Sequence, residues 1–456
     1  MASRNRARMT TRRQFIARTA ATAAALTVAP YMKTSHSAGK LAVGLADHWV
    51  PGANEVMSGL VKEWATKNGV EVALDIITTE GFKDILTGEA EAAAKEGHDL
   101  LSHPLAQVAV HKDSLDPVDD IVNEQSKRYG PFTKNAKYLS FFDGHWMAFP
   151  TSVQDQSFPV VARMDLWKQH AGIDLPAMFP AKSRDKAAQD KIDKEWTYDA
   201  FLEAARKLHK AGFPWGNQIG QTGDSPTWIG PMFRAFGSIL INEKGEVAVD
   251  SPETRQVLEY FKKLTEVMPK DVYAWNDASN NRWIISGQGS AIQNPPSVWA
   301  VASRDAPKIA EQLWHFDTPK GPKGRFRGGW HYFWGIWKFA KNKQAAKDLT
   351  LFLQTKENGA KLIKASRGYD MTPLPSWKDI PVWGEEGPPV GTLFNYPPQG
   401  DEEMTIGGAP APPAIAAKII NNSTYSTLIA KVTQGGQTID QAIDWAKDEL
   451  EGYLRS

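Results

Sequence analysis

The chain after residue 39 alternates short apolar runs with amphipathic stretches. Apolar runs at 40–45, 70–77 and 98–101 predict strands. Apolar residues at helical spacing predict a helix over 53–67 and a second helix that ends near residue 95. Strands that alternate with helices indicate a parallel, doubly wound α/β sheet, in which ligands bind beyond the carboxyl ends of the strands.

Residues 145–167 contain two apolar strands separated by a polar stretch. Phe149 belongs to the first strand and Phe158 to the second, and the polar residues 152–156 between them have little reason to lie in a core. This pattern favours a chain that leaves one lobe and enters another, and such a crossing would border a ligand cleft. An ordinary hairpin with a polar loop is the alternative.

The second half of the chain carries the same kinds of signal. Helix starts are predicted at Thr197, at Ser251-Pro252 and at the capping box Thr438-x-x-Gln441. Strands are predicted at 290–293, 313–317 and 330–337. Loops are predicted at 177–193, 212–228 and 381–413, and a Gly/Lys/Pro-rich connector at 319–324 is interpreted as a second crossing.

Composition narrows the class of protein. A length of 456 residues predicts two or three domains, and 42% hydrophobic with 23% charged residues is ordinary for a soluble globular protein. Seventeen tryptophans are a surplus that indicates flat faces for ligand stacking in addition to core. The chain has no cysteine, which excludes disulfides, thiolate metal sites, a cysteine nucleophile and a lipid-modified N-terminal cysteine.

Residues 1–38 are predicted to be a cleaved secretory signal. Six arginines without an acid precede the alanine-rich run 19–29, which is too short to span a bilayer. Residues 11–16 (TRRQFI) match the twin-arginine pattern; a Sec signal with a chance arginine pair or a mitochondrial presequence are the alternatives. We expect export by the twin-arginine machinery to the periplasm, without a lipid anchor.

Removal of the leader changes the charge of the chain. The leader holds seven basic residues, so the remainder has 46 basic and 52 acidic residues and a net charge of −6. A negative surface argues against nucleic acid or an anionic membrane as a partner. No other segment approaches 18 apolar residues, so no further membrane span is predicted.

Several segments together resemble the extracellular solute-binding proteins of bacterial ABC importers, family 1, which includes the maltose-type sugar binders. The segments, in chain order, are Ser114–Asp120, Phe142–Pro150, Glu195–Phe201, Ile285–Ile292, Gly328–Trp330 and Phe339–Ala346. Each match is weak alone, and their order and spacing over nearly all of residues 40–456 make the set strong.

The resemblance implies a two-lobed α/β fold, each lobe a doubly wound, mostly parallel sheet with flanking helices, joined by a multi-strand hinge. Lobe 1 would comprise 39–152 plus 318–355 and lobe 2 would comprise 155–316 plus 366–456, with crossings near 152–156, 316–324 and 355–366. It further implies a monomer that closes on one solute and delivers it to an inner-membrane ABC permease.

Candidate ligand contacts follow from the strand ends, the crossings and the Gly- and Trp-rich loops. Sugars have apolar ring faces and hydroxyl-lined edges, so their sites combine aromatic rings with planar hydrogen-bonding groups. The predicted contacts are Asp47, His48, Trp49, Thr79, Glu80, Ser102, Gln154, Asp155, Gln221, Asp224, Trp228, Asn294, Trp299, Trp330, His331, Arg367 and Tyr369.

The sequence offers little support for catalysis or for a cofactor. His98, His103 and His111 lack a helical metal spacing, and no metal or cofactor is predicted. Adjacent acidic pairs such as Asp119-Asp120 diverge and do not form an acid/base pair. We therefore predict a carbohydrate- or polyol-binding protein and not an enzyme. The same fold with another solute, such as a polyamine, an amino-acid derivative or an organic acid, and a secreted carbohydrate-active enzyme remain as alternatives.

Overall fold

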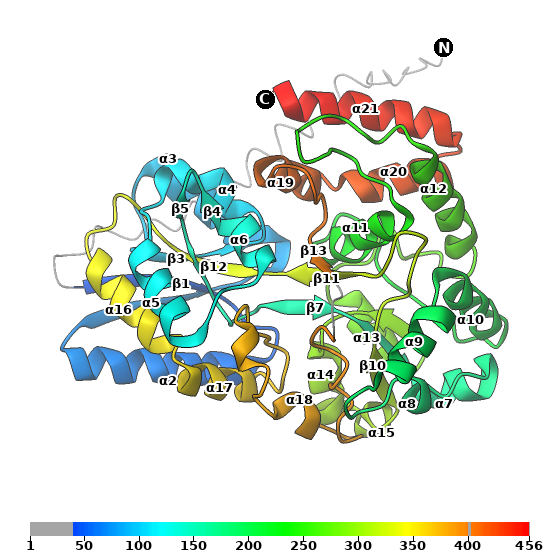
Figure 1. Ribbon diagram of the computed structural model, residues 1–456, viewed down its shortest axis with the longest axis horizontal. Coiled ribbons are helices and arrows are strands. Elements are labelled where there is room, and N and C mark those ends of the chain that lie inside the picture. Colours follow the sequence, from blue (N-terminus) through cyan, green and yellow to red (C-terminus); the bar gives the residue numbers. More distant parts are fainter. Residues whose placement is uncertain (1–39, 400–402, 456) are drawn as a thin grey trace, which may run out of the picture.

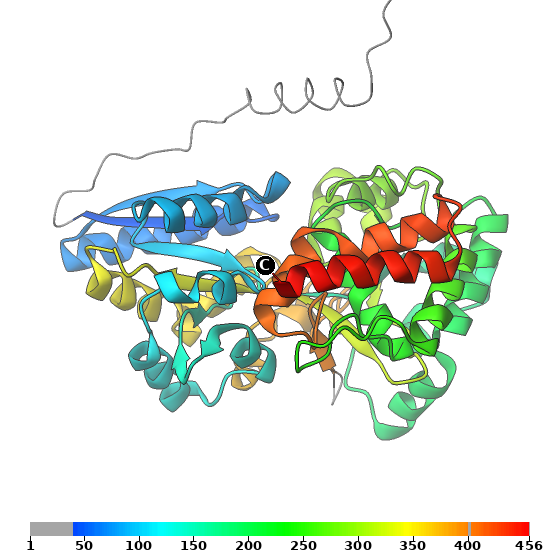
Figure 2. The same ribbon diagram turned by 90° about the horizontal axis from the view of Figure 1, so that it is seen from above.

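The computed structural model describes residues 40–399 and 403–455, so the predicted leader lies outside the described residues. Figure 1 shows two α/β lobes side by side along the long axis, and Figure 2 shows the same separation from above. The predicted two-lobed α/β class is confirmed.

Lobe 1 contains a five-stranded sheet in the order β2-β1-β3-β12-β6. The first three strands are parallel, as predicted, while β12 is antiparallel to both of its neighbours. The strands are β1 (Lys40–Ala46), β2 (Glu71–Ile77), β3 (Leu100–Pro104), β6 (Phe149–Pro150) and β12 (Tyr332–Ile336). The elements around it are α2 (Pro51–Asn68), η1 (Glu80–Phe82), α3 (Lys83–Ala94), α4 (Gln107–His111), η2 (Lys112–Ser114), α5 (Asp119–Tyr129), α6 (Lys134–Ser140), the hairpin β4 (Phe141–Phe142) and β5 (His145–Trp146), α16 (Lys343–Leu353) and α17 (Lys356–Ala365).

Helix α2 illustrates why this lobe folds. Pro51 occupies its first turn and Gly69 ends it in the left-handed conformation. Its buried face includes Leu60 and Trp64, which share one hydrophobic cluster with Leu41 and other residues of β1. An amphipathic stripe over a sheet is the arrangement that the sequence pattern predicts.

Lobe 2 is built on a three-stranded sheet in the order β10-β8-β9, and here the predicted mostly parallel pairing is wrong. Strand β8 (Val160–Arg163) is antiparallel to both β9 (Ala291–Gln293) and β10 (Leu313–Phe316). The helical connection from β9 to β10 brings these two strands into the same direction, but β8 lies between them. The alternation of strand and helix patterns in the sequence predicts the helical connection between β9 and β10. It does not predict that β8 lies between these two strands.

Helices make up most of lobe 2. They are α7 (Met164–Leu166), η3 (Trp167–Ala171), α8 (Leu175–Met178), α9 (Lys186–Glu195), α10 (Tyr198–Lys210), α11 (Asp224–Phe236), α12 (Pro252–Thr265), α13 (Ser279–Ile285), α14 (Ser297–Asp305), α15 (Pro307–Ala310), η4 (Pro375–Trp377), α18 (Val382–Glu385), α19 (Pro413–Asn421), α20 (Thr424–Thr433) and α21 (Ile439–Arg455). The predicted caps at Thr197 and Ser251 and the box at Thr438 and Gln441 are confirmed by their hydrogen bonds. The predicted loop at 177–193 is partly wrong, because it contains the end of α8 and most of α9.

A third small sheet lies between the lobes in Figure 1. Its order is β13-β11-β7, from Glu403–Thr405, Phe326–Trp330 and Gln156–Phe158. Strand β7 follows β6 of lobe 1 and precedes β8 of lobe 2, so the chain passes from sheet to sheet over residues 151–160. The predicted single strand at 330–337 is two strands, since β11 ends at Trp330 in the central sheet and β12 begins at Tyr332 in lobe 1.

Among residues 40–399 and 403–455, no helix has both the length and the apolar character that crossing a bilayer requires.

Candidate functional site

A pocket opens between the two lobes beside the central sheet. Its empty space, including the part open to solvent, is about 560 Å³. It is lined by Trp49, Thr79, Phe82, Asp84, Gln156, Phe158, Gly223, Asp224, Asp277, Asn281, Asn294, Pro295, Ser297, Trp330, Tyr332 and Tyr369.

The lobe 1 wall comes from the ends of parallel strands. Ala46 of β1 pairs with Ile77 of β2, so the residues that follow each strand emerge at one edge of the sheet. Trp49 follows β1 and Thr79 follows β2, and both line the pocket. This is the edge at which the sequence predicts ligand contacts.

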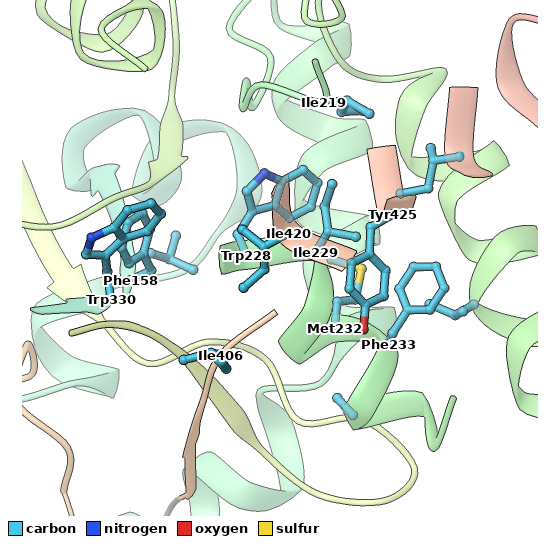
Figure 3. Close-up of a cluster of buried hydrophobic side chains, with 14 of the residues drawn as sticks. Phe158, Ile219, Trp228, Ile229, Met232, Phe233, Trp330, Ile406, Ile420 and Tyr425 are labelled. Carbon is cyan, nitrogen blue, oxygen red and sulfur yellow. The ribbon is translucent and has the colours of Figure 1, made fainter. Parts of the chain in front are cut away.

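The back of the pocket is formed by the central sheet. Trp330 of β11 pairs with Gln156 of β7, two residues from Phe158, so the three side chains share one face of the sheet. Figure 3 shows the rings of Trp330 and Phe158 together, apart from Trp228. At Gly328 a Cβ atom would lie 2.0 Å from the Thr227 carbonyl oxygen, so the missing side chain lets α11 approach β11.

The lobe 2 wall is a polar network at helix starts. The Asn280 amide donates to the Asn294 Oδ1 at 2.9 Å, and the Asn294 amide donates to the Asn281 Oδ1 at 2.8 Å. Ser297, which begins α14, accepts from the Asn294 amide at 3.2 Å. Tyr369 completes the wall and donates its hydroxyl to the Gln156 Oε1. Planar amides held in this way present fixed donors and acceptors to a ligand.

Three carboxyl groups reach the pocket, and burial raises the pKa of each. Burial raises the pKa of Asp84 to about 6, although the Tyr332 hydroxyl donates to it at 2.9 Å. Burial and the neighbouring Asp277 raise the pKa of Asp224 well above its usual range. Burial likewise raises the pKa of Asp277, against the hydrogen bond that its Oδ1 accepts from the Asp224 backbone N–H. Perturbed carboxyls in a cavity are typical of functional sites.

Six of the predicted contact residues line this pocket. They are Trp49, Thr79, Asp224, Asn294, Trp330 and Tyr369. They come from both lobes and from the central sheet, so the fold brings together residues that are up to 320 positions apart in sequence.

A second group lies behind the pocket and holds segments together. The His48 Nε2 is 2.9 Å from the Asp370 Oδ1, and the Gln154 amide donates to the backbone oxygens of Ala46 and Asp47. Ser102 accepts from the Ala46 backbone N–H at 3.3 Å. His48, Ser102 and Gln154 line a separate small cavity instead of the main pocket.

The remaining predicted residues have structural or surface positions. Asp155 is paired with His331, whose Nε2 also contacts Asn135. Arg367 forms an ion pair with Glu386 and lies over the Trp299 ring at 4.2 Å. Glu80 and Gln221 are exposed and do not line the pocket, although each lies within two residues of a lining residue in the sequence; they are called rim residues below.

The tryptophan surplus is explained mainly by core. Trp228 and Trp299 are fully buried, and their indole N–H groups donate to the backbone oxygens of Gln218 and Pro388. Only Trp49 and Trp330 line the pocket among the described tryptophans.

The sequence reasoning missed several lining residues. Phe82 and Asp84 lie at the start of α3, and Asp277 and Asn281 lie around the start of α13. A signal existed for α3, because this helix follows the end of β2. No local signal marks Asp277, which reaches the pocket through tertiary packing. Among residues 40–399 and 403–455, no group of three or more His, Asp or Glu side chains is arranged to hold a metal ion.

The chain was compared with known proteins and solved structures. No curated protein matches the chain. Maltose-bound MalE3 of T. maritima has a TM-score of 0.70 at 19% identity, covering 90% of this chain and 99% of that one. A solute-binding protein of Thermotoga lettingae bound with α-D-tagatose has a TM-score of 0.70 at 16% identity, covering 91% and 99%. A sugar transporter protein from Arthrobacter chlorophenolicus with bound laminaribiose has a TM-score of 0.70 at 13% identity, with the same coverage.

These likenesses establish the fold. Residues 52–360, more than half of the chain, match the family described as bacterial extracellular solute-binding protein. The membership predicted from the sequence motifs is confirmed, and the family is described as one of binding proteins, not of enzymes. The chain belongs to the bacterial extracellular solute-binding protein family.

Proposed function

We propose that this protein captures a sugar or polyol in the pocket between its lobes and delivers it to the permease of an ABC importer. The observation that carries the proposal is the combination of Trp330 and Trp49 with the amide and carboxyl groups of both walls. Flat rings suit the apolar faces of a sugar, and planar polar groups suit its hydroxyls. The structural neighbours with bound maltose, tagatose and laminaribiose support the same solute class.

The proposed contact set is narrower than the one predicted from sequence. It keeps the six predicted residues that line the pocket and adds Asp84, Gln156 and Asp277. Residues buried behind the pocket or exposed at its rim are left out.

The proposed mechanism is closure about the crossings between the lobes. We assign lobe 1 to 39–152 plus 318–355 and lobe 2 to 155–316 plus 366–456. Helix α17, between these ranges, packs against α2 of lobe 1. The pairing of β7 with β11 supports the first two crossings. A solute that contacts both walls interacts with the closed form more than with the open form, so binding shifts the population toward closure.

The proposed location is the periplasm. The protein would leave the cytoplasm through the twin-arginine machinery, lose residues 1–38, and act as a monomer without a lipid anchor. Replacing Arg12 and Arg13 together by Lys should retain the precursor in the cytoplasm. Export of that variant through the Sec route would contradict the twin-arginine assignment.

The solute class is tested by titrating purified protein with mono- and oligosaccharides and sugar alcohols. Tryptophan fluorescence and calorimetry report binding, and small-angle scattering reports closure. At least one sugar or polyol should bind and compact the protein. Binding of none of them refutes the carbohydrate assignment, and turnover of a glycoside would indicate an enzyme instead.

A further inference from the structure

Among the described residues, the lining of the proposed solute pocket contains acidic residues and no basic residue. Three of its lining residues are aspartates, and they come from separate elements: Asp84 from α3, Asp224 from α11 and Asp277 from the loop before α13. None of the described residues that line the pocket is lysine, arginine or histidine. The negative charge that these carboxyls can carry is therefore not balanced by the pocket itself.

Within the described residues, the hydrogen bonds that these carboxyls accept come from neutral donors. Asp84 accepts from the Tyr332 hydroxyl at 2.9 Å. Asp224 accepts from the Gln218 amide at 2.6 Å and from the Asn280 amide at 3.4 Å. Neutral donors stabilise a carboxylate only partly, which agrees with the raised pKa of both groups.

Three buried aspartates outside this group each contact a histidine or an arginine. Asp370 contacts the His48 Nε2 at 2.9 Å, and Asp155 is paired with His331. Asp317 lies 2.7 Å from the Arg184 Nη1. Buried charged acids are normally paired with a base, so carboxyls in a solute pocket whose lining offers only neutral partners suit a solute that supplies the cation.

Helix dipoles account for only part of this acidity. Asp84 and Asp224 lie in the first turns of α3 and α11, where a carboxylate is favourable. Asp277 belongs to neither helix, and it already accepts from the Asp224 backbone N–H at 3.1 Å. The start of α11 therefore faces two carboxyls, more than its partial positive charge can balance.

Aromatic rings complete the environment that an organic cation prefers. Trp49, Trp330, Tyr332 and Tyr369 line the same pocket. The faces of such rings attract an ammonium group, and the attraction is larger where water is excluded.

We propose that the solute is an amino sugar or amino polyol, and that its ammonium group lies among Asp84, Asp224 and Asp277. This inference rests on the proposed function and specifies the solute class of the same site. The hydroxyls of the solute would meet the amide network of Asn281 and Asn294, while its ring face would meet Trp330.

The test is a calorimetric titration with matched triads at pH 7. Each triad contains a neutral sugar, its 2-amino-2-deoxy form and the N-acetylated amine, for the gluco, galacto and manno series; glucitol and 1-amino-1-deoxyglucitol form a polyol pair. In at least one series the amine should bind about tenfold or more tighter than both neutral members.

The outcomes separate this inference from the proposed function. If neutral members bind as tightly as the amines, the inference fails and the sugar assignment stands. If putrescine or spermidine binds and no sugar does, the sugar assignment fails and the ammonium site stands. If none of these compounds binds, both are refuted.

Charge-removing variants locate the ammonium group. Asp277→Asn and Asp84→Asn should each weaken amine binding about tenfold more than they weaken binding of the neutral members, because the amide keeps the shape and an acceptor oxygen but loses the charge. Asp305→Asn is the matched control, since Asp305 is exposed and paired with Arg304 far from the pocket lining. Thermal unfolding confirms that each variant is folded. Equal losses for amine and neutral ligands would refute the charge role.

Discussion

Two tryptophans that look alike in the sequence have opposite roles in the structure. Trp228 of α11 is 0% exposed and donates its indole N–H to the Gln218 backbone oxygen at 2.9 Å. Trp330 of β11 is 9% exposed and lines the pocket with Phe158. Figure 3 draws the rings of Trp330 and Phe158 next to each other. Both belong to one hydrophobic cluster with Trp228, but of the two tryptophans only Trp330 also lines the pocket, where we propose that its ring meets the solute. The number of tryptophans alone therefore does not predict ligand contacts. A tryptophan lines the pocket where a strand end or a crossing between the lobes places its ring beside the cavity.

The same contrast holds for carboxyl groups. Asp370 behind the pocket is buried against His48, whereas Asp84 in the pocket is buried against a neutral hydroxyl. Core residues are arranged for stability, and pocket residues are held in an arrangement that lowers stability until a ligand is bound.

The largest expected effect is a loss of stability on replacing Trp228, which lies in the core and not in the pocket. Trp228→Ala should lower the free energy of unfolding by about 3–5 kcal/mol, because it leaves a cavity and removes the indole hydrogen bond to the Gln218 carbonyl. Urea unfolding followed by circular dichroism measures this loss. The affinity of the molecules that remain folded should change little. A collapse of affinity with intact stability would place Trp228 in the site.

The second expected effect concerns Asp84. Its pKa is raised from 3.8 to about 6 in the folded protein, so the folded state is most stable below about pH 4 with respect to this group and loses that stability as the pH rises through about 6. Asp84→Asn should abolish this loss, and above pH 7 the variant should be more stable by up to about 3 kcal/mol.

Thermal and urea unfolding of both proteins between pH 4 and 8 measure the Asp84 effect. The difference in stability should grow from pH 4 to about pH 7 and then stay level. A difference that is constant with pH would show that Asp84 is not buried in the way described.

The third expected effect is a loss of solute affinity on removing the flat ring of Trp330. Trp330→Leu keeps an apolar side chain on β11 and removes the flat surface, so affinity for the sugar that the panel identifies should fall by about 1–2 kcal/mol, or about tenfold. Calorimetry gives the affinity, and unfolding should show a smaller loss than Trp228→Ala. An unchanged affinity would mean that the ring does not contact the solute.

The smallest expected effect is at the rim. Gln221→Ala removes an exposed side chain that was predicted to bind and does not line the pocket. Its affinity should stay within about twofold of the parent and its stability within about 0.5 kcal/mol. A larger loss of affinity would restore Gln221 to the contact set.

The local elements were largely predictable, because strand and helix periodicity around β1, α2 and β2 reflects burial on one face. The start of α10 was also predictable, since Thr197 accepts from the Ala200 backbone N–H. The antiparallel insertion of β8 in lobe 2 was not, because strand order is set by contacts distant in sequence.

The site was predictable to the extent that it follows strand ends. Trp49 and Thr79 lie where the parallel-sheet rule places ligand contacts. Trp299 and His331 were predicted by the same kind of loop reasoning and pack away from the pocket, because residue type does not determine the direction of a side chain. Asp277 was missed because it enters the site only after α11 and α13 have packed together.

The rim residues Glu80 and Gln221 offer a practical use. Glu80 follows β2 in lobe 1 and Gln221 precedes α11 in lobe 2, and both are exposed. Since the chain has no cysteine, a cysteine placed at each position would be the sole thiol pair available to maleimide dyes. Energy transfer between two such dyes would then change when the lobes close. The labelled protein could therefore serve as a fluorescent sensor for its solute.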